Sequence, residues 1–110
     1  MDLNDYQKKA LETAVYPKDQ EIVYTALGLG NEAGEVMGKI KKWIRGDDGE
    51  GEMSDVRKQL LKEELGDVLW YLSGLAGALG FELEEVARVN IAKLSSRKER
   101  GTLHGDGDKR

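Results

Sequence analysis

The chain carries a single proline, at position 17, and no stretch in which β-branched apolar residues alternate with polar ones. Such alternation is typical of a half-buried strand, so a sheet has little to build on. We therefore expect an all-α fold. At 110 residues the chain should form one domain with a modest core, and self-association would add to its stability. The prediction is an oligomer of four-helix bundle-like subunits.

Glycine and proline divide the sequence into four helical segments followed by a tail. Tyr16-Pro17 ends the first segment, because the residue before a proline avoids helical geometry. The acidic, glycine-rich stretch 46–55 ends the second segment. Ser54 is suited to cap the third segment, and Gly80 is suited to stop it. The expected helices are residues 4–15, 19–45, 54–79 and 83–97, with residues 1–99 forming the domain and residues 100–110 a polar tail or lid.

Glycines are frequent in the second helical segment. Gly30, Gly34 and Gly38 are four residues apart and form one ridge, although interior glycines cost about 0.5–1 kcal/mol each relative to alanine. Either a neighbouring helix approaches this ridge, within the subunit or between subunits, or the helix is flexible there. The residues predicted for the core are Tyr6, Ala10, Leu11, Ala14, Ile22, Leu29, Val36, Ile40, Trp43, Val86, Val89, Ile91 and Leu94.

Two acidic pairs lie where small and apolar residues should build helix cores: Glu32/Glu35 in NEAGEV and Glu64/Asp67 in EELGDV. An exposed helical carboxylate usually finds a basic residue three or four positions away. Of these four residues only Glu35 has such a partner, Lys39. We therefore interpret the other three as directed inward, and the two pairs together as pointing to a bound metal ion.

An antiparallel hairpin folded around residues 46–53 would place the two pairs opposite each other. Glu35 then faces Glu64, and Glu32 faces Asp67, about 15 Å from the loop. Four clustered carboxylates repel one another unless a divalent cation neutralises them, and all-oxygen ligands favour Mg²⁺ or Mn²⁺ over Zn²⁺. Ferritin-like di-iron sites need Glu-x-x-His motifs, whereas the single histidine of this chain lies in the tail.

Charge is unevenly distributed along the chain. Residues 88–110 contribute +4 and residues 1–87 contribute −8 to the net charge of −4, and this acidic balance argues against nucleic acid as a partner. On the fourth segment, Asn90, Lys93 and Arg97 share one helix face, where they are suited to bind phosphate oxygens. A solvated basic face is the alternative interpretation.

The sequence also limits the cellular setting. It contains no cysteine, so disulfides and thiolate metal sites are excluded. The acidic start MDLNDYQKK does not resemble a signal peptide, and the longest weakly polar run, residues 68–81, is too short to cross a bilayer. We expect a cytoplasmic protein without a membrane span.

Taken together, the motifs resemble those of the MazG-type all-α nucleoside triphosphate pyrophosphohydrolases. The family pattern is Glu-x-x-Glu, a spacer and Glu-x-x-Asp, matched by EAGE at 32–35 and ELGD at 64–67 with 28 residues between them. The segments GLGNEAGEV, EELGDVLWYL and NIAKLSSR are also similar. The resemblance covers residues 3–97 and implies a dimer or tetramer. Such an enzyme would hydrolyse NTPs or dNTPs to monophosphate and pyrophosphate with Mg²⁺, for which Mn²⁺ would substitute.

The resemblance also implies roles for individual residues. A water activated by the metal would attack the α-phosphorus, with Glu32 or Glu35 as the base. Asn31 stands where some members have an acidic residue, which leaves open the identity of the base and the number of ions. Nucleotide-pool housecleaning would be a fitting physiological role. The residues that match the metal ligands are Glu32, Glu35, Glu64 and Asp67, and those that match the phosphate-contacting positions are Asn90, Lys93 and Arg97.

Other features leave alternatives open. Tyr6 and Gln7, with Trp43 or Trp70, would contact a nucleobase, although the tryptophans suit a core equally well. The tail would close over the triphosphate or stay disordered. The same fold would act on dUTP or phosphoribosyl-ATP, or the chain would be a non-catalytic helical oligomer that binds nucleotide or a partner protein around a structural ion. Turnover with Mg²⁺ separates the enzymes from the binding module.

Overall fold

The computed structural model describes residues 1–110 and contains helices and turns without strands. The prediction of an all-α fold with four α-helices is confirmed. None of these helices is long and apolar enough to span a membrane. The elements are α1 (Leu3–Leu11), a short 3₁₀ turn η1 (Lys18–Gln20), α2 (Glu21–Ile44), α3 (Asp55–Ala78) and α4 (Leu83–Glu99).

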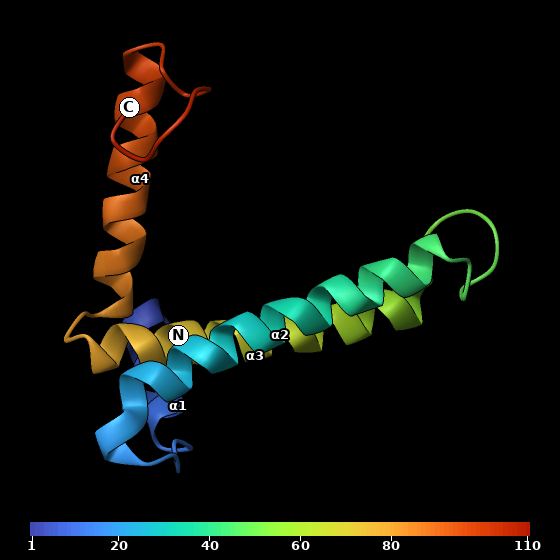
Figure 1. Cartoon of the computed structure of the whole chain (residues 1–110), viewed down its shortest axis with the longest axis horizontal. Coiled ribbons are helices and arrows are strands. Elements are labelled where there is room, and N and C mark those ends of the chain that lie inside the picture. Colours follow the sequence, from blue (N-terminus) through green and yellow to red (C-terminus); the bar gives the residue numbers. More distant parts are fainter.

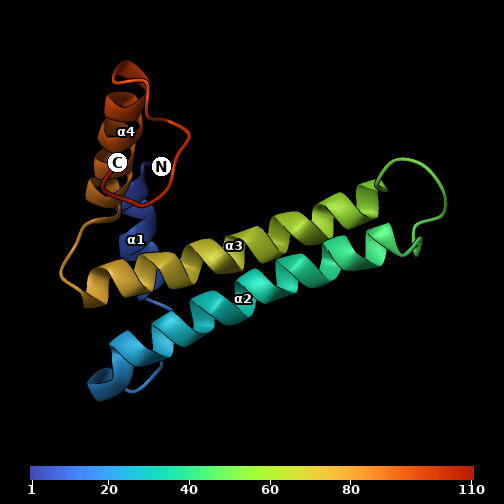
Figure 2. The same ribbon diagram turned by 45° about the horizontal axis from the view of Figure 1, so that its top comes forward.

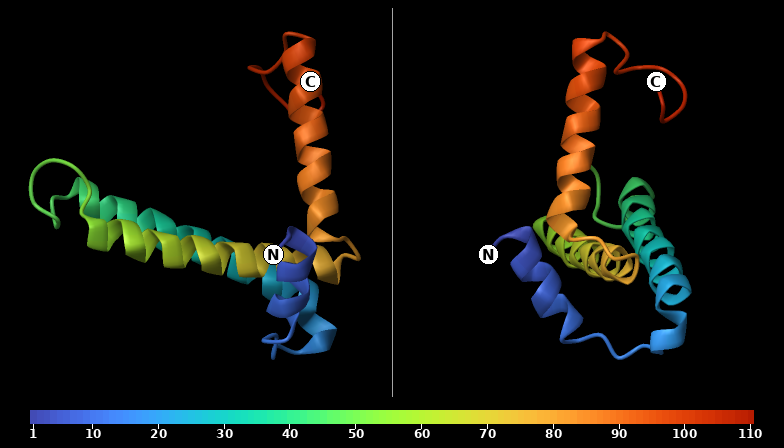
Figure 3. Two further views of the ribbon diagram at one scale, coloured as in Figure 1. Left: turned by 180° about the vertical axis from the view of Figure 1, so that it is seen from behind. Right: turned by 90° about the vertical axis from the view of Figure 1, so that its left-hand side faces the viewer.

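Helices α2 and α3 form a long antiparallel hairpin, and α1 and the start of α4 gather at its open end (Figures 1 and 2). Helix α4 then leaves the hairpin steeply, so that its C-terminal half stands away from the other helices with only the tail beside it (Figure 3). Within one chain the four helices therefore do not close into a compact bundle. The radius of gyration is 17.0 Å, against about 13 Å expected for a compact domain of this length.

Helix α1 is shorter than predicted and ends at Leu11 instead of Val15. The hydroxyl of Thr13 donates to the carbonyl of Ala10 at 2.8 Å and accepts from the indole N–H of Trp70 at 2.8 Å. A threonine that bonds to nearby backbone offers the chain an alternative to helix. The same pair of bonds docks the end of α1 against α3.

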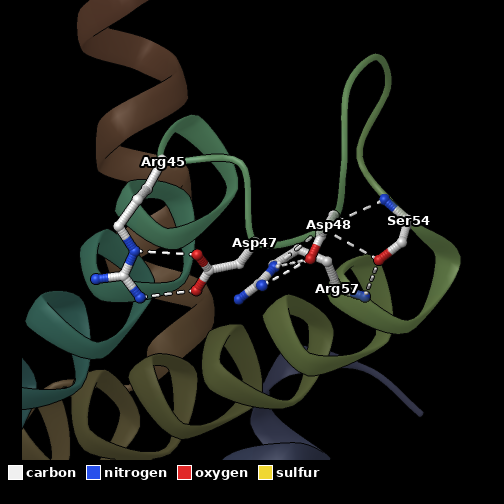
Figure 4. Close-up of polar contacts among 5 residues, drawn as sticks. All are labelled: Arg45, Asp47, Asp48, Ser54 and Arg57. Atoms are coloured by element: carbon white, nitrogen blue, oxygen red, sulfur yellow. Dashed lines mark hydrogen bonds and ion pairs between the residues drawn. The ribbon is translucent and has the colours of Figure 1, made fainter.

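A polar network closes the turn between α2 and α3 (Figure 4). Asp48 accepts hydrogen bonds from the guanidinium of Arg57 at 2.7 Å and from the hydroxyl of Ser54 at 3.1 Å. Ser54 also caps α3, as predicted, by accepting from the backbone N–H of Arg57 at 3.1 Å. Arg45 pairs with Asp47 at 2.7 Å. The side chains of Arg57 and Asp48 are only 10% and 8% exposed, so this pair is an internal support for the hairpin.

Side chains of α1 hold the start of α4. The amide nitrogen of Gln7 donates to the carbonyl of Phe81 at 3.0 Å, and its oxygen accepts from the N–H of Leu83 at 2.9 Å. The side-chain oxygen of Asn4 accepts from the N–H of Glu84 at 3.0 Å. Helix α4 has no side-chain cap of its own, so α1 satisfies N–H groups that would otherwise lack partners.

The glycine ridge predicted on α2 meets no other part of the chain. A Cβ atom added at Gly30, Gly34 or Gly38 would have no heavy atom within 4 Å. Gly28 is the α2 glycine that allows close packing, because an added Cβ would lie 2.1 Å from a ring carbon of Tyr71 on α3. Any close partner of the ridge must therefore come from outside the single chain.

The core of the single chain is small. Ala10 is buried as predicted, whereas Leu11, Ile22, Val89, Ile91 and Leu94 are between 39% and 63% exposed. For these five residues the core prediction is wrong in the isolated chain, because no other helix covers most of α4 and parts of α1 and α2 are uncovered. The buried residues are Ala10, Thr25, Ser73, Ala76, Leu83 and Arg97.

Candidate functional site

Three of the four predicted metal ligands converge between α2 and α3. Glu32 comes from α2, and Glu64 and Asp67 come from successive turns of α3. One carboxylate oxygen from each residue lies within 4.8 Å of the others. The antiparallel hairpin brings them together, and the three-residue spacing puts Glu64 and Asp67 on one face of α3. We call Glu32, Glu64 and Asp67 the carboxylate cluster.

Glu35, the fourth predicted ligand, lies beside the carboxylate cluster and outside its closest group. It is exposed, and it stands about one helical turn from Glu32 on α2. Its negative charge nevertheless contributes to the raised pKa of Glu32. The site therefore consists of three converging carboxylates with a fourth within electrostatic reach.

The electrostatics of the carboxylate cluster favour a cation. Burial raises the pKa of Glu32, and the charges of Asp67, Glu64 and Glu35 raise it further, together with a hydrogen bond to Glu64. Each of these causes disfavours the ionised form. A divalent cation would relieve the repulsion, and the all-carboxylate donor set suits a hard ion such as Mg²⁺ or Mn²⁺.

An aromatic wall borders the carboxylate cluster. Trp70 and Tyr71 of α3 line an open pocket of about 300 Å³ together with Glu32 and Asp67. The rings of Trp70 and Tyr71 pack edge to face with centroids 4.9 Å apart. Burial raises the pKa of Tyr71, and Tyr24, Glu32 and Asp67 raise it further. Tyr71 is a site residue that the sequence motifs did not predict, although it follows Asp67 by four residues and so lies on the same face of α3.

The two residues predicted to contact a nucleobase lie in different surroundings. Tyr6 is half-buried, and both burial and the charge of Asp67 raise its pKa, so it lies within electrostatic reach of the carboxylate cluster. Gln7 instead bonds to the turn between α3 and α4 through Phe81 and Leu83. Its amide therefore has a structural role that the sequence did not reveal.

A larger pocket lies between α1 and α3. Its volume is about 390 Å³, and its lining includes Gln7, Tyr16, Trp70 and Phe81. Trp70 borders both this pocket and the carboxylate pocket. The larger pocket thus adjoins the acidic site at Trp70.

The predicted phosphate-binding residues lie on α4. Lys93 and Arg97 both contact Asp108 of the tail, whose carboxylate is 2.9 Å from the Lys93 ammonium and 3.2 Å from the Arg97 guanidinium. Arg97 also donates to the backbone carbonyl of Asp108, whereas Asn90 is exposed. The C-terminal half of α4 stands away from the hairpin (Figures 1 and 3). A single chain does not bring these residues to the carboxylate cluster.

Comparison with known proteins places the carboxylate cluster inside a described domain. The family model of the MazG nucleotide pyrophosphohydrolase domain matches residues 20–102. The chain is also 40% identical over 116 aligned positions to the Gene 37 protein of Mycobacterium phage L5, covering 100% of each sequence. No solved structure matches the chain.

Proposed function

This chain belongs to the MazG nucleotide pyrophosphohydrolase family, and we propose that it hydrolyses nucleoside or deoxynucleoside triphosphates to monophosphate and pyrophosphate with Mg²⁺. The observation that carries the proposal is the convergence of Glu32, Glu64 and Asp67 from two helices to within 4.8 Å. These carboxylates lie inside the residues that match the family. Nucleotide-pool housecleaning is the physiological role that we propose.

We propose distinct roles for the four carboxylates. Glu32, Glu64 and Asp67 would hold Mg²⁺ or Mn²⁺, and Glu35 would complete the site from its rim. When bound, the ion would supply charge neutralisation for the phosphates and acidification of an attacking water. Glu32 or Glu35 would accept the proton from the water that attacks the α-phosphorus. The half-buried position of Glu32 among other carboxylates supports it as the first candidate.

The nucleobase would lie against the aromatic side chains around the carboxylate cluster. Tyr6 and Tyr71 are the rings whose pKa values respond to Asp67, and Trp70 lines both neighbouring pockets. Stacking on such rings is worth about 1–3 kcal/mol per base and tolerates different bases. Gln7 would contribute only if it released its bonds to Phe81 and Leu83.

We propose that the active form is a homo-oligomer. The chain has an accessible surface of 8067 Å², against about 6,100 Å² for a compact protein of 12.2 kDa. The excess of about 2,000 Å² exceeds the roughly 800 Å² that each partner buries in a standard interface. Self-association would cover this surface, and it offers a route by which Lys93 and Arg97 of one chain reach the carboxylate cluster of another.

One face of α2 is the candidate contact surface. Its large apolar side chains are between 62% and 76% exposed. Together with Gly30 and Gly34 they follow one another at spacings of three, four and seven, which places them on one stripe opposite the face that carries Gly28 and Glu32 toward α3. A second copy is the occupant that we propose for this α2 stripe. The residues of the α2 stripe are Val23, Leu27, Gly30, Gly34, Met37 and Ile44.

The test is a Mg²⁺-dependent assay across the NTPs and dNTPs, including dUTP, in which monophosphate, pyrophosphate and orthophosphate are separated. The proposal requires monophosphate plus pyrophosphate from at least one substrate. Asp67→Asn should lose this activity, whereas the matched variant Asp55→Asn, which changes an exposed carboxylate at the start of α3, should retain it. Binding without turnover by the wild type would indicate a binding module instead.

A further inference from the structure

One basic side chain enters the carboxylate cluster. The ammonium of Lys39 lies 3.5 Å from a carboxylate oxygen of Glu64, and both side chains are 19% exposed. Among the ion pairs of the chain, this pair alone includes a member of the carboxylate cluster. It also joins α2 to α3, whereas local spacing on the helix would have paired Lys39 with Glu35.

The helical geometry explains why Lys39 reaches the carboxylate cluster. Spacings of three and four place Glu32, Glu35 and Lys39 on one face of α2. Helical side chains lean toward the N-terminus of their helix, so the long stem of Lys39 lies back toward Glu35 and Glu32. The antiparallel hairpin then presents Glu64 to its ammonium. The contact follows from the same register that assembles the carboxylate cluster.

An ammonium and a divalent ion compete for the same carboxylate. When an ion binds Glu64, its double charge repels the ammonium of Lys39 and takes oxygen lone pairs that the ammonium now contacts. Lysine is a compact charge on a flexible four-carbon stem, so Lys39 has room to move its ammonium without moving α2. A negatively charged phosphate of the substrate would offer it a new partner beside the carboxylate cluster.

We infer that Lys39 is the counter-ion of the metal-free site and that it exchanges Glu64 for a substrate phosphate when the metal and the nucleotide bind. This inference rests on the proposed function for the identity of the anion. Without substrate, the positive charge of Lys39 would weaken metal binding at Glu64. With substrate bound, the same charge would strengthen the binding of phosphate. A lysine that only positioned Glu64 as a ligand would instead strengthen metal binding.

The test measures Mn²⁺ binding to the full chain without nucleotide, by calorimetry or by the electron paramagnetic resonance signal of free Mn²⁺. Lys39→Met should bind Mn²⁺ about 3- to 10-fold more tightly than the wild type, because a nearby positive charge is removed. Lys39→Arg keeps the charge and should stay near the wild type. Lys42→Met removes an exposed lysine of the same helix and is the matched control.

A second arm titrates pyrophosphate in the presence of Mg²⁺. Lys39→Met should bind it at least about tenfold more weakly, since a charge-assisted contact to phosphate is lost. Unchanged or weaker Mn²⁺ binding by Lys39→Met, or unchanged pyrophosphate binding, would overturn the inference. Absence of nucleotide turnover by the wild type would instead overturn the proposed function, because neither arm depends on catalysis. A wild type that binds no Mn²⁺ would overturn both.

Discussion

The carboxylate of Asp108 lies 2.9 Å from the ammonium of Lys93. A tail residue therefore forms an ion pair with an α4 side chain that is proposed to bind phosphate. Arg97 contacts the same carboxylate at 3.2 Å. Hydrogen bonds from Lys93 and Arg97 hold the pKa of Asp108 below its usual value. Asp108 of the tail thus gives Lys93 and Arg97 a negatively charged partner, as a substrate phosphate would.

Asp108→Asn should therefore lower the KM for the nucleotide, because Lys93 and Arg97 no longer have to give up a carboxylate before they bind phosphate. The control is Asp106→Asn, which removes a neighbouring acid of the tail that forms no ion pair. Steady-state kinetics of both variants would check this. A rise in KM would indicate that the tail closes over the substrate and assists its binding.

Leu27→Glu should dissociate the proposed oligomer. Leu27 is 70% exposed in the single chain and belongs to the apolar α2 stripe. Burying the new carboxylate in an interface without a partner costs several kcal/mol. Light scattering after size exclusion should give more than 12.2 kDa for the wild type and the monomer mass for the variant. Val56→Glu changes another exposed apolar residue, on α3, and should keep the oligomer intact.

Gly28→Ala should destabilise the fold by about 1–3 kcal/mol, the usual cost of overpacking. The added methyl group would lie 2.1 Å from the ring of Tyr71, so α2 or the ring must move. Gly66→Ala is the matched control, because nothing lies within 4 Å of its added Cβ and alanine favours a helix by about 0.5–1 kcal/mol. Denaturant unfolding of both variants measures the difference. Equal stabilities would contradict the tight contact between the helices.

The Asp48–Arg57 pair should make the stability of the protein fall as the pH is lowered into the acid range. Hydrogen bonds from Arg57 lower the pKa of Asp48 more than burial raises it, and Ser54 lowers it further. A carboxyl whose pKa is lower in the folded state stabilises the protein above its unfolded pKa, and this contribution is lost as pH falls through the folded value. Asp48→Asn should lower the Tm at pH 7, and its Tm should approach that of the wild type in acid.

The control for that experiment is Glu50→Gln, in the same loop, which forms no ion pair and should leave the Tm unchanged at both pH values. A constant difference in Tm between Asp48→Asn and the wild type across the acid range would show that the charge of Asp48 contributes nothing. Thermal unfolding followed by circular dichroism from pH 7 down to about pH 2 covers the window set by the lowered pKa.

Local patterns in the sequence were sufficient to predict the hairpin and its cap. The glycine-rich break at residues 46–55 and the cap at Ser54 depend on neighbours in the chain, and both appear in the structure. The juxtaposition of Glu32 with Asp67 followed from an antiparallel register, which is a simple consequence of one loop between two long helices. Such features do not require knowledge of the tertiary packing.

Other features depend on contacts between distant segments and escaped prediction. The direction of α4 is set by bonds from Asn4 and Gln7 to its first turn, and no helical periodicity encodes such bonds. Lys39 found Glu64 across the hairpin instead of Glu35 on its own helix. Three of the four core positions predicted on α4, Val89, Ile91 and Leu94, are exposed in the single chain. An apolar stripe indicates that a partner exists, but it does not identify whether the partner belongs to the same chain.

The most direct test of the central claim is hydrolysis in ¹⁸O-labelled water with Mg²⁺, followed by mass spectrometry of the products. Attack of water on the α-phosphorus predicts one ¹⁸O atom in the monophosphate and none in the pyrophosphate. Asp67→Asn should release little of either product. Label in pyrophosphate or orthophosphate, or full activity of Asp67→Asn, would contradict the assignment of the carboxylate cluster as the metal site of a pyrophosphohydrolase.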